Sequence, residues 1–232
     1  MYFGHSAEIW QEFPQLVPGV MVVAGIGVEA EAEVEARLQP WLERARGRLA
    51  AGSEGQLAEV SAWRRAYSAM GLKPTKYRSA AEALLRRFRR EGDLPRLHPL
   101  VDLCNALSVA FALPVAVFDL AQIDSFLEVR RAKGTETYLA FSGQTETPPP
   151  DEIIFADAAD HVHARRWTFR QSRQSTISPA SERVLIVSEG LHDTAPADVA
   201  ALIEALAAEI SQVWSQPQAQ VILTVDNPRL TF

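Results

Sequence analysis

The chain has 232 residues, of which 47% are hydrophobic and 22% are charged, and its formal net charge is −6. These proportions are typical of a globular protein with a full core, so they exclude an intrinsically disordered chain and a protein that is basic over its whole surface. The single cysteine, Cys104, excludes an internal disulfide and indicates a reducing compartment.

The first hundred residues are predicted to be mainly helical. Their pattern of apolar residues and glycines predicts a short helix or a turn over 7–10, helices over 29–50, 56–70 and 80–90, and one buried strand over 19–25. Ser79 and Glu82 have the spacing of a capping box, which favours a helix that begins at residue 80. A basic loop with a proline, Leu72 to Arg78, precedes that helix.

The remainder of the chain is predicted to be rich in strands. After a mostly apolar helix over 99–112, strands are predicted over 114–119, 126–131, 137–141, 152–157, 162–170, 183–188 and 221–225. A helix capped by Asp193 or Thr194 precedes the last strand. Because the helices come first and the strands follow, the order predicts an α+β fold. The sequence shows no internal repeat and no marked shift in composition, so we expect a single domain over 1–232.

Charge is unevenly distributed along the chain. Residues 1–63 carry nine acidic residues against four arginines, whereas residues 64–98 carry ten Lys and Arg against three acidic residues. A basic region on an acidic protein is expected where one face meets a polyanion, although a solvated helix face is the commoner origin of such clusters.

Common catalytic signatures are absent. The sequence has neither a nucleotide-binding glycine loop nor a Gly-x-Ser-x-Gly elbow, so we expect no cofactor. His161 and His163 would share one face of a strand but lack a nearby third ligand, which favours a surface pair and no metal site. No apolar run is long enough to span a membrane, and we expect a cytoplasmic protein.

Three polar residues occur at intervals of three in the apolar helix. Asp102, Asn105 and Ser108 would lie on one side of a helix over 99–112. Buried polar groups need hydrogen-bond partners, so these side chains either line a binding pocket or bond to neighbouring backbone.

Two further segments contain candidate site residues. Glu136 follows Gly134 in a predicted turn, where it either faces solvent or binds a ligand amine or hydroxyl. On a strand over 162–170, Arg166 and Arg170 would share one face, which suits either a phosphate or carboxylate partner or a salt-bridged sheet surface.

Several segments together match one known family. The matching segments are Trp63–Ser79, Glu82–Arg87, Leu94–Pro95, Val101–Asn105 with Ser108, Leu113–Val115, Phe118–Asp119, Gly134 with Glu136, Ile154–Asp157 and Arg165–Trp167. On these segments the chain resembles the free-standing B3/B4 domain proteins, relatives of the editing domain in the β subunit of phenylalanyl-tRNA synthetase. The match covers roughly residues 60–175 and says more about family than about activity.

The resemblance implies a layered α+β fold with a β-sandwich core flanked by helices. It also implies a trans-editing hydrolase that deacylates misacylated tRNA by attack of water on the ester, without a covalent enzyme intermediate. The implied partner is the aminoacylated 3′ end of a tRNA; no DNA and no membrane partner is implied, and a homo-oligomer stays open.

The resemblance also implies roles for particular residues. The implied catalytic residues are Asn105 and Glu136, the implied substrate-binding residues are Ser108, Arg166, Gln171 and Asp102, and the implied RNA-binding residues are Lys73, Thr75, Lys76 and Arg87. Cys104 stands where the family commonly has an aromatic residue, and Asp124–Phe126 where a glycine turn is common, so the substrate stays open. Two other functions are also open: a non-catalytic tRNA- or RNA-binding module, and a protein that binds or hydrolyses a free amino acid derivative.

Overall fold

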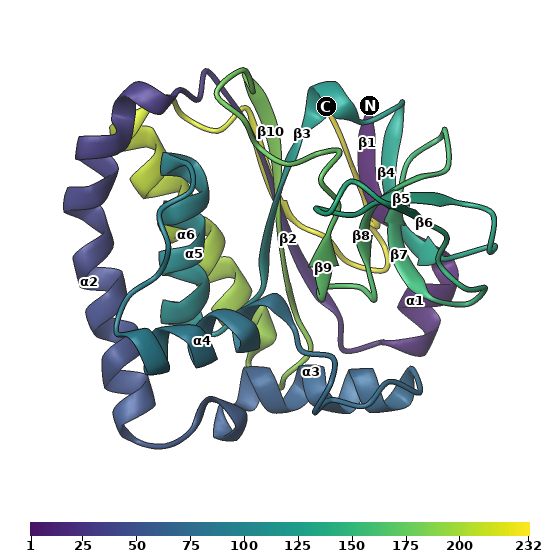
Figure 1. The fold of residues 1–232 in the computed structure, drawn as a ribbon, viewed down its shortest axis with the longest axis horizontal. Coiled ribbons are helices and arrows are strands. Elements are labelled where there is room, and N and C mark those ends of the chain that lie inside the picture. Colours follow the sequence, from purple (N-terminus) through teal and green to yellow (C-terminus); the bar gives the residue numbers. More distant parts are fainter.

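The computed structural model describes residues 1–232 and contains two β-sheets with a group of helices packed beside one of them (Figure 1). The α-helices are α1 (Ala7–Glu12), α2 (Glu31–Ala50), α3 (Ala58–Ala69), α4 (Ala80–Glu91), α5 (Pro99–Phe111) and α6 (Ala195–Val213). The strands are β1 (Tyr2–His5), β2 (Val17–Ala24), β3 (Val115–Asp119), β4 (Phe126–Arg131), β5 (Thr137–Leu139), β6 (Thr145–Glu146), β7 (Ile153–Ala156), β8 (His161–Arg165), β9 (Arg170–Gln171), β10 (Arg183–Gly190), β11 (Ala219–Ile222) and β12 (Arg229–Thr231).

The four-stranded sheet lies in the middle of the molecule, between the helices and the second sheet (Figure 1). Its strand order is β11-β2-β10-β3, and all neighbours are antiparallel. Met21 and Val23 of β2 pack with the helices, whereas Val20 and Val22 pack in the core beneath the other sheet. Because both faces are buried, β2 and β10 read as nearly continuous apolar runs.

Helix α6 packs very closely against β2 at Gly19. A Cβ added at Gly19 of β2 would lie 2.5 Å from Cγ1 of Ile203 and 2.7 Å from Cγ1 of Val199, both on α6. Glycine is therefore required at this position, because any side chain would push the helix away from the strand.

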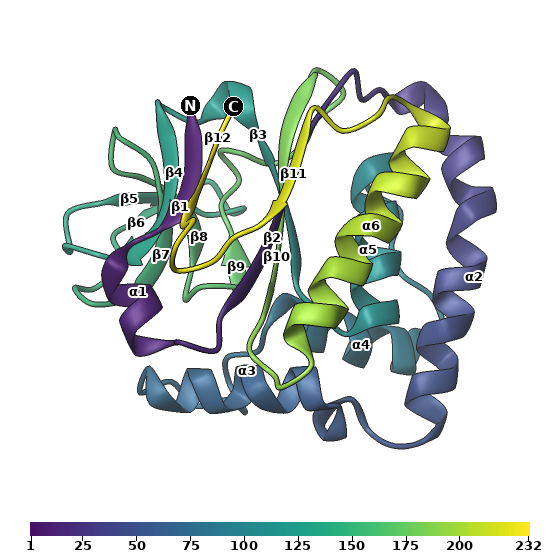
Figure 2. The same cartoon turned by 180° about the vertical axis from the view of Figure 1, so that it is seen from behind.

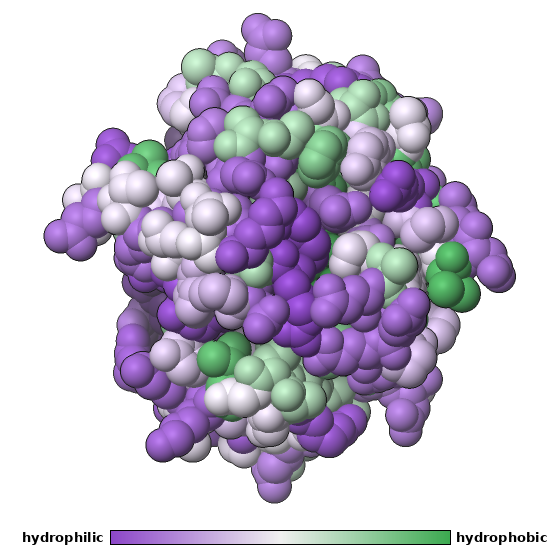
Figure 3. Space-filling model, turned by 90° about the vertical axis from the view of Figure 1, so that its right-hand side faces the viewer, coloured by the Kyte–Doolittle hydropathy of each residue, from purple (hydrophilic) through white to green (hydrophobic).

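The second sheet has eight strands and joins the two ends of the chain. Its order is β12-β1-β4-β7-β8-β5-β6, with β9 paired to β8. β1 runs parallel to β4 and antiparallel to β12, so the two termini lie side by side (Figure 2). The outer surface of this half of the molecule is mostly hydrophilic, with small scattered apolar areas (Figure 3).

Helix α3 runs along one end of both layers (Figure 1). Its Trp63 and Tyr67 are buried, and the Trp63 ring meets Trp167 edge to face with 5.0 Å between centroids. The predicted capping box is present in part, because Ser79 Oγ accepts a hydrogen bond from the backbone N–H of Glu82 at the start of α4.

The α+β class is confirmed, but one predicted strand is wrong. The segment 162–170 is divided into β8 and β9 by a turn in which Arg166 and Trp167 have left-handed φ angles of 48° and 59°. Arg166 and Arg170 therefore do not share one face of a strand. His163 is buried rather than part of a surface pair, and its Nε2 lies 3.2 Å from Asp157 Oδ2.

Strands β1 and β12 were not predicted, because each is too short to show an alternating pattern. No helix of the structure combines the length and the apolar character that crossing a membrane would require.

Candidate functional site

Two cavities meet at the edge strand β3, and Gln171 and Val115 line both. The outer cavity, about 250 Å³, lies between α5 and β3; the inner cavity, about 70 Å³, lies between the two sheets. The outer cavity is lined by Leu97, His98, Val101, Cys104, Asn105, Val115, Val117, Phe141, Gln171, Thr176 and Ile177. Segments from four parts of the chain, at 97–105, 115–117, 141 and 171–177, therefore line one cavity.

Asn105 is the polar residue of α5 that faces the outer cavity. Its side chain is half-buried and makes no hydrogen bond with any protein group. Most other residues of α5 are buried in the helical core, which holds the backbone of Asn105 in place. An amide with two N–H donors and a carbonyl acceptor is thus free to bind a ligand in this cavity.

Gln171 lies opposite α5 and is fixed by two hydrogen bonds. Its Nε2 donates to the carbonyl oxygen of Val117 at 2.7 Å, and its backbone carbonyl accepts from the Tyr138 hydroxyl at 2.8 Å. The first bond occupies a carbonyl on the open edge of β3. The Gln171 side-chain oxygen has no protein donor, so it is available to a ligand or to water.

His98 was missed by the sequence analysis and lies at the other end of the outer cavity. It is the N-cap residue of α5, and its Nδ1 accepts a hydrogen bond from the backbone N–H of Leu100 at 3.2 Å. Burial lowers the pKa of His98, which favours the neutral ring with its proton on Nε2. A histidine directly before Pro99, at a predicted helix start, was the available signal.

Two apolar side chains flank the mouth of the outer cavity. Leu97 is 70% exposed and Phe141 is 58% exposed, and both line the cavity. Large apolar groups that stay exposed beside a cavity are suited to contact an apolar or planar part of a ligand.

The inner cavity has a buried carboxylate in its wall. Glu189 of β10 is 2% exposed, and its Oε1 accepts from Trp167 Nε1 at 2.9 Å and lies 2.7 Å from His5 Nε2. These contacts connect β1, β10 and the left-handed turn between β8 and β9. They help to hold the left-handed backbone at Trp167 in place.

The basic loop before α4 packs against the same turn. The backbone N–H of Ala80 donates to the carbonyl of Thr168 at 2.8 Å, and both residues line the inner cavity. Tyr77 meets Phe169 edge to face at 5.3 Å, and the Arg166 guanidinium lies 4.7 Å from the centre of the Tyr77 ring. Arg166 therefore stacks on Tyr77 and does not line the inner cavity.

Most cations of the basic region already have acidic partners. Seven of the ten Lys and Arg residues of 64–98 form ion pairs: Arg64 and Arg78 with Glu82, Arg86 and Arg89 with Glu54, Arg87 and Arg90 with Glu91, and Arg96 with Glu35. The other three, Arg65, Lys73 and Lys76, form none and are exposed, as is Thr75. Lys73, Thr75 and Lys76 thus form an exposed group on the loop before α4, whereas Arg87 pairs with Glu91 on its own helix.

Glu136 lies outside both cavities and is fully buried. Its carboxylate accepts from Arg130 Nη1 at 2.5 Å and from the backbone N–H groups of Lys133, Gly134 and Thr135. Burial alone would raise the pKa of Glu136, but these hydrogen bonds outweigh it and lower the pKa to about 2. The carboxylate therefore organises its own loop and has no free oxygen for a substrate.

The other two polar residues of α5 also have local partners. Ser108 is fully buried, and its hydroxyl donates to the carbonyl of Leu113 at 2.6 Å. Asp102 accepts from the backbone N–H of Leu97 at 2.8 Å and lines a neighbouring cavity with Arg96; burial raises the pKa of Asp102. Of the predicted site residues, the structure brings Asn105 and Gln171 together and places Glu136, Ser108 and Asp102 elsewhere.

The structure is thus a two-sheet α+β fold with an amide-lined cavity at the edge of its four-stranded sheet. The chain belongs to the B3/4 domain family, because the model of that family matches residues 62–209.

The chain is also similar to short parts of longer curated proteins. The chain is similar to the phenylalanine–tRNA ligase beta subunits of Rhodopseudomonas palustris (38% identity over 90 residues), Thiobacillus denitrificans (36% over 76) and Shewanella oneidensis (34% over 73). These matches cover 39%, 33% and 32% of this chain and span only 11%, 10% and 9% of the relatives' length. Among solved structures, an N-terminal fragment of the phenylalanyl-tRNA synthetase beta-subunit from Pyrococcus horikoshii matches with a TM-score of 0.38 and 11% identity, over 48% of this chain and 39% of that one.

Proposed function

We propose that the protein hydrolyses the ester bond of misacylated tRNA and that the acyl group enters the outer cavity. One observation carries this proposal: the free amide of Asn105 faces the same cavity as Gln171, in a family related to phenylalanine–tRNA ligase beta subunits. The neighbouring groups suit an acyl ester, because they are neutral hydrogen-bonding groups beside apolar walls.

The spacing along α5 orients the substrate. Asn105 and His98 are seven residues apart, which is about 10 Å along a helix axis, and Val101 lies between them. The acyl side chain lies along Val101 towards Leu97 and His98. Its ester lies at the other end, between Asn105 and Gln171.

Water is the nucleophile in this proposal, because the cavity offers no activated side chain. Burial raises the pKa of the Cys104 thiol far above neutrality, and the Thr176 hydroxyl already donates to the carbonyl of Ser172 at 3.0 Å. The inner cavity of about 70 Å³ has room for a few water molecules and adjoins the ester end through Gln171.

The proposed reaction is a simple hydrolysis. Water adds to the ester carbonyl carbon, and the Asn105 N–H donates to the oxygen that becomes negative. The bond from carbon to the ribose oxygen then breaks, and the ribose oxygen takes the proton that the water gives up. One such donor contributes roughly a hundredfold or more to the rate in known acyl-transfer sites.

The RNA is held weakly in this proposal. Lys73 and Lys76 lie on the loop that leads to Ala80, which lines the inner cavity, and few other cations of the basic region are free. Binding then depends on a small number of phosphates near the 3′ end, with a shallow salt dependence.

The test is single-turnover deacylation of a panel of mischarged tRNAs, which includes the phenylalanine tRNA charged with tyrosine. We expect the protein to release at least one amino acid well above the buffer rate, and Asn105→Ala to abolish most of that release. Asn227→Ala, which changes an exposed asparagine in the β11–β12 loop, is the matched control. Release that is no faster than in buffer for every tRNA refutes the proposal.

A free amino acid ester or amide is the second candidate substrate. It is favoured by the outer cavity's lack of ionised side chains and by the many ion pairs that occupy the basic region. The protein would then hydrolyse short amino acid esters, and added tRNA would not inhibit that hydrolysis. This result would support the second candidate over the first.

A further inference from the structure

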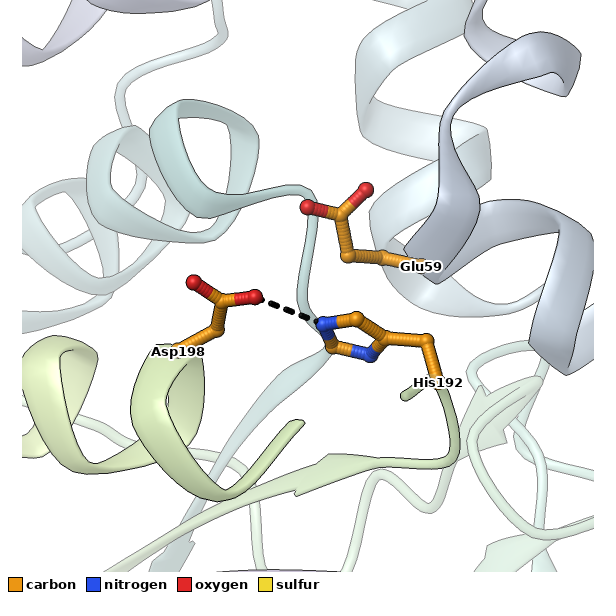
Figure 4. Close-up of side chains that lie close together, drawn as sticks. All are labelled: Glu59, His192 and Asp198. Atoms are coloured by element: carbon orange, nitrogen blue, oxygen red, sulfur yellow. Dashed lines mark hydrogen bonds and ion pairs between the residues drawn. The ribbon is translucent and has the colours of Figure 1, made fainter. Parts of the chain in front are cut away.

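Three side chains of metal-binding type meet away from the two cavities. Glu59 comes from the first turn of α3, His192 from the turn after β10, and Asp198 from the first turn of α6 (Figure 4). One ligand atom from each lies within 4.8 Å of the other two. His192 and Glu59 are buried, and the Asp198 side chain is 37% exposed, so the cluster opens to solvent on one side.

The contacts within the cluster leave one carboxylate oxygen unsatisfied. His192 Nε2 lies 2.8 Å from Asp198 Oδ2, and Arg48 Nη2 donates to Glu59 Oε1 at 2.5 Å. Glu59 is 7% exposed, and its Oε2 is buried without any hydrogen-bond partner, as is His192 Nδ1. Buried polar atoms without partners are rare and destabilising, so the His192–Asp198 and Arg48–Glu59 contacts do not fully account for this arrangement.

A bound cation would satisfy the free oxygen. The Glu59 carboxylate lies near the His192 ring and Asp198, with its oxygens turned away from the ring, so it would have to rotate to share an ion with them (Figure 4). In a tetrahedral zinc site with bonds of about 2.0–2.1 Å, ligand atoms lie about 3.3 Å apart. The 2.8 Å contact would open slightly and Glu59 would move inwards, which side-chain rotation can achieve.

The surroundings also suit a metal ion. Both carboxylates already have an orienting partner, since Arg48 holds Glu59 and the Thr194 hydroxyl donates to Asp198 Oδ2 at 2.6 Å. Such outer contacts orient ligands in known metal sites. Three protein ligands leave a fourth position for water on the exposed side, and an imidazole with two carboxylates favours Zn²⁺ over Mg²⁺ or Ca²⁺.

We propose that Glu59, His192 and Asp198 form a Zn²⁺ site that ties α3 to the start of α6. The site joins segments more than 130 residues apart in the chain and lies outside the outer and inner cavities. It is independent of the proposed ester hydrolysis, and its ligands take no part in that reaction.

The test is titration of the chelator-treated 232-residue chain with Zn²⁺ alone. Binding is measured by calorimetry and by competition with a coloured chelator. We expect one Zn²⁺ per chain with micromolar or tighter affinity, at least tenfold weaker binding in Asp198→Asn and in Glu59→Gln, and no comparable response to Mg²⁺. Asp193→Asn, an exposed neighbour without an ion pair, should bind Zn²⁺ as the unchanged chain does.

Circular dichroism first establishes that each variant is folded. Glu59 also pairs with Arg48, so Glu59→Gln could fail to fold, and in that case the test depends on the Asp198→Asn result. No binding at micromolar Zn²⁺, or binding that Asp198→Asn leaves unchanged, overturns the proposal. Equal loss in Asp193→Asn also overturns it, because the ion would then be held nonspecifically by surface charge.

Discussion

Replacing Asn105 separates a functional role from a structural one. The side chain makes no hydrogen bond with the protein, so Asn105→Ala breaks none. Alanine also has a higher helix propensity than asparagine, by up to about 0.7 kcal/mol. The free energy of unfolding of the variant should therefore equal or slightly exceed that of the unchanged chain.

The catalytic rate should change in the opposite direction. If the Asn105 N–H donates to the oxygen that becomes negative, its loss should slow deacylation about 100-fold, which corresponds to about 2.7 kcal/mol of activation free energy. The isosteric Asn105→Asp keeps the shape but replaces the N–H donor with an anionic oxygen, so its rate should fall at least as far.

The assay combines urea unfolding with single-turnover deacylation of the most reactive mischarged tRNA. A variant that is as stable as the unchanged chain and deacylates within twofold of its rate would refute the role of Asn105. A variant that loses both stability and activity would show instead that the asparagine is structural.

Two further results are expected. Replacing both Lys73 and Lys76 with alanine should reduce the steepness of the plot of log affinity for tRNA against log salt concentration by roughly 1.4–1.8, because each lysine neutralises one phosphate. The control Arg90→Ala should leave the slope unchanged. Filter binding at several salt concentrations measures the slopes, and equal slopes would contradict an RNA contact through this loop. The pKa of Glu136 is lowered from 4.5 to about 2, so the stability it contributes is complete above pH 4.5 and is lost as the pH falls towards 2. Glu136→Gln should therefore lower the free energy of unfolding by about 3 kcal/mol at pH 7 and by much less at pH 2. The folded variant should deacylate tRNA at the unchanged rate. A folded variant that deacylates more slowly would indicate a catalytic role for this carboxylate.

Local signals predicted the helices well. The hydrogen bond from the Glu82 N–H to Ser79 depends on residues three apart, and the apolar helix predicted over 99–112 is observed as α5. Such features depend on neighbouring residues, so a single sequence contains the necessary information.

The turn between β8 and β9 could not be predicted in this way. Neither Arg166 nor Trp167 favours a left-handed backbone, and the turn is held by the bond from Trp167 to Glu189, 22 residues away. The hydrogen bonds of Glu136 could not be predicted either. Its partner Arg130 lies on β4, and the donors at 133–135 are backbone N–H groups, which the residue types do not reveal. Sequence identifies such side chains as candidates, but the fold decides which ones stay free.

The most direct test of the proposed site is a crystal structure of the protein with a non-hydrolysable aminoacyl-adenosine, in which an amide replaces the ester. The account predicts the acyl side chain along Val101 in the outer cavity and the amide carbonyl within hydrogen-bond distance of Asn105 Nδ2. A ligand bound at another surface, with Asn105 and Gln171 left untouched, would contradict it.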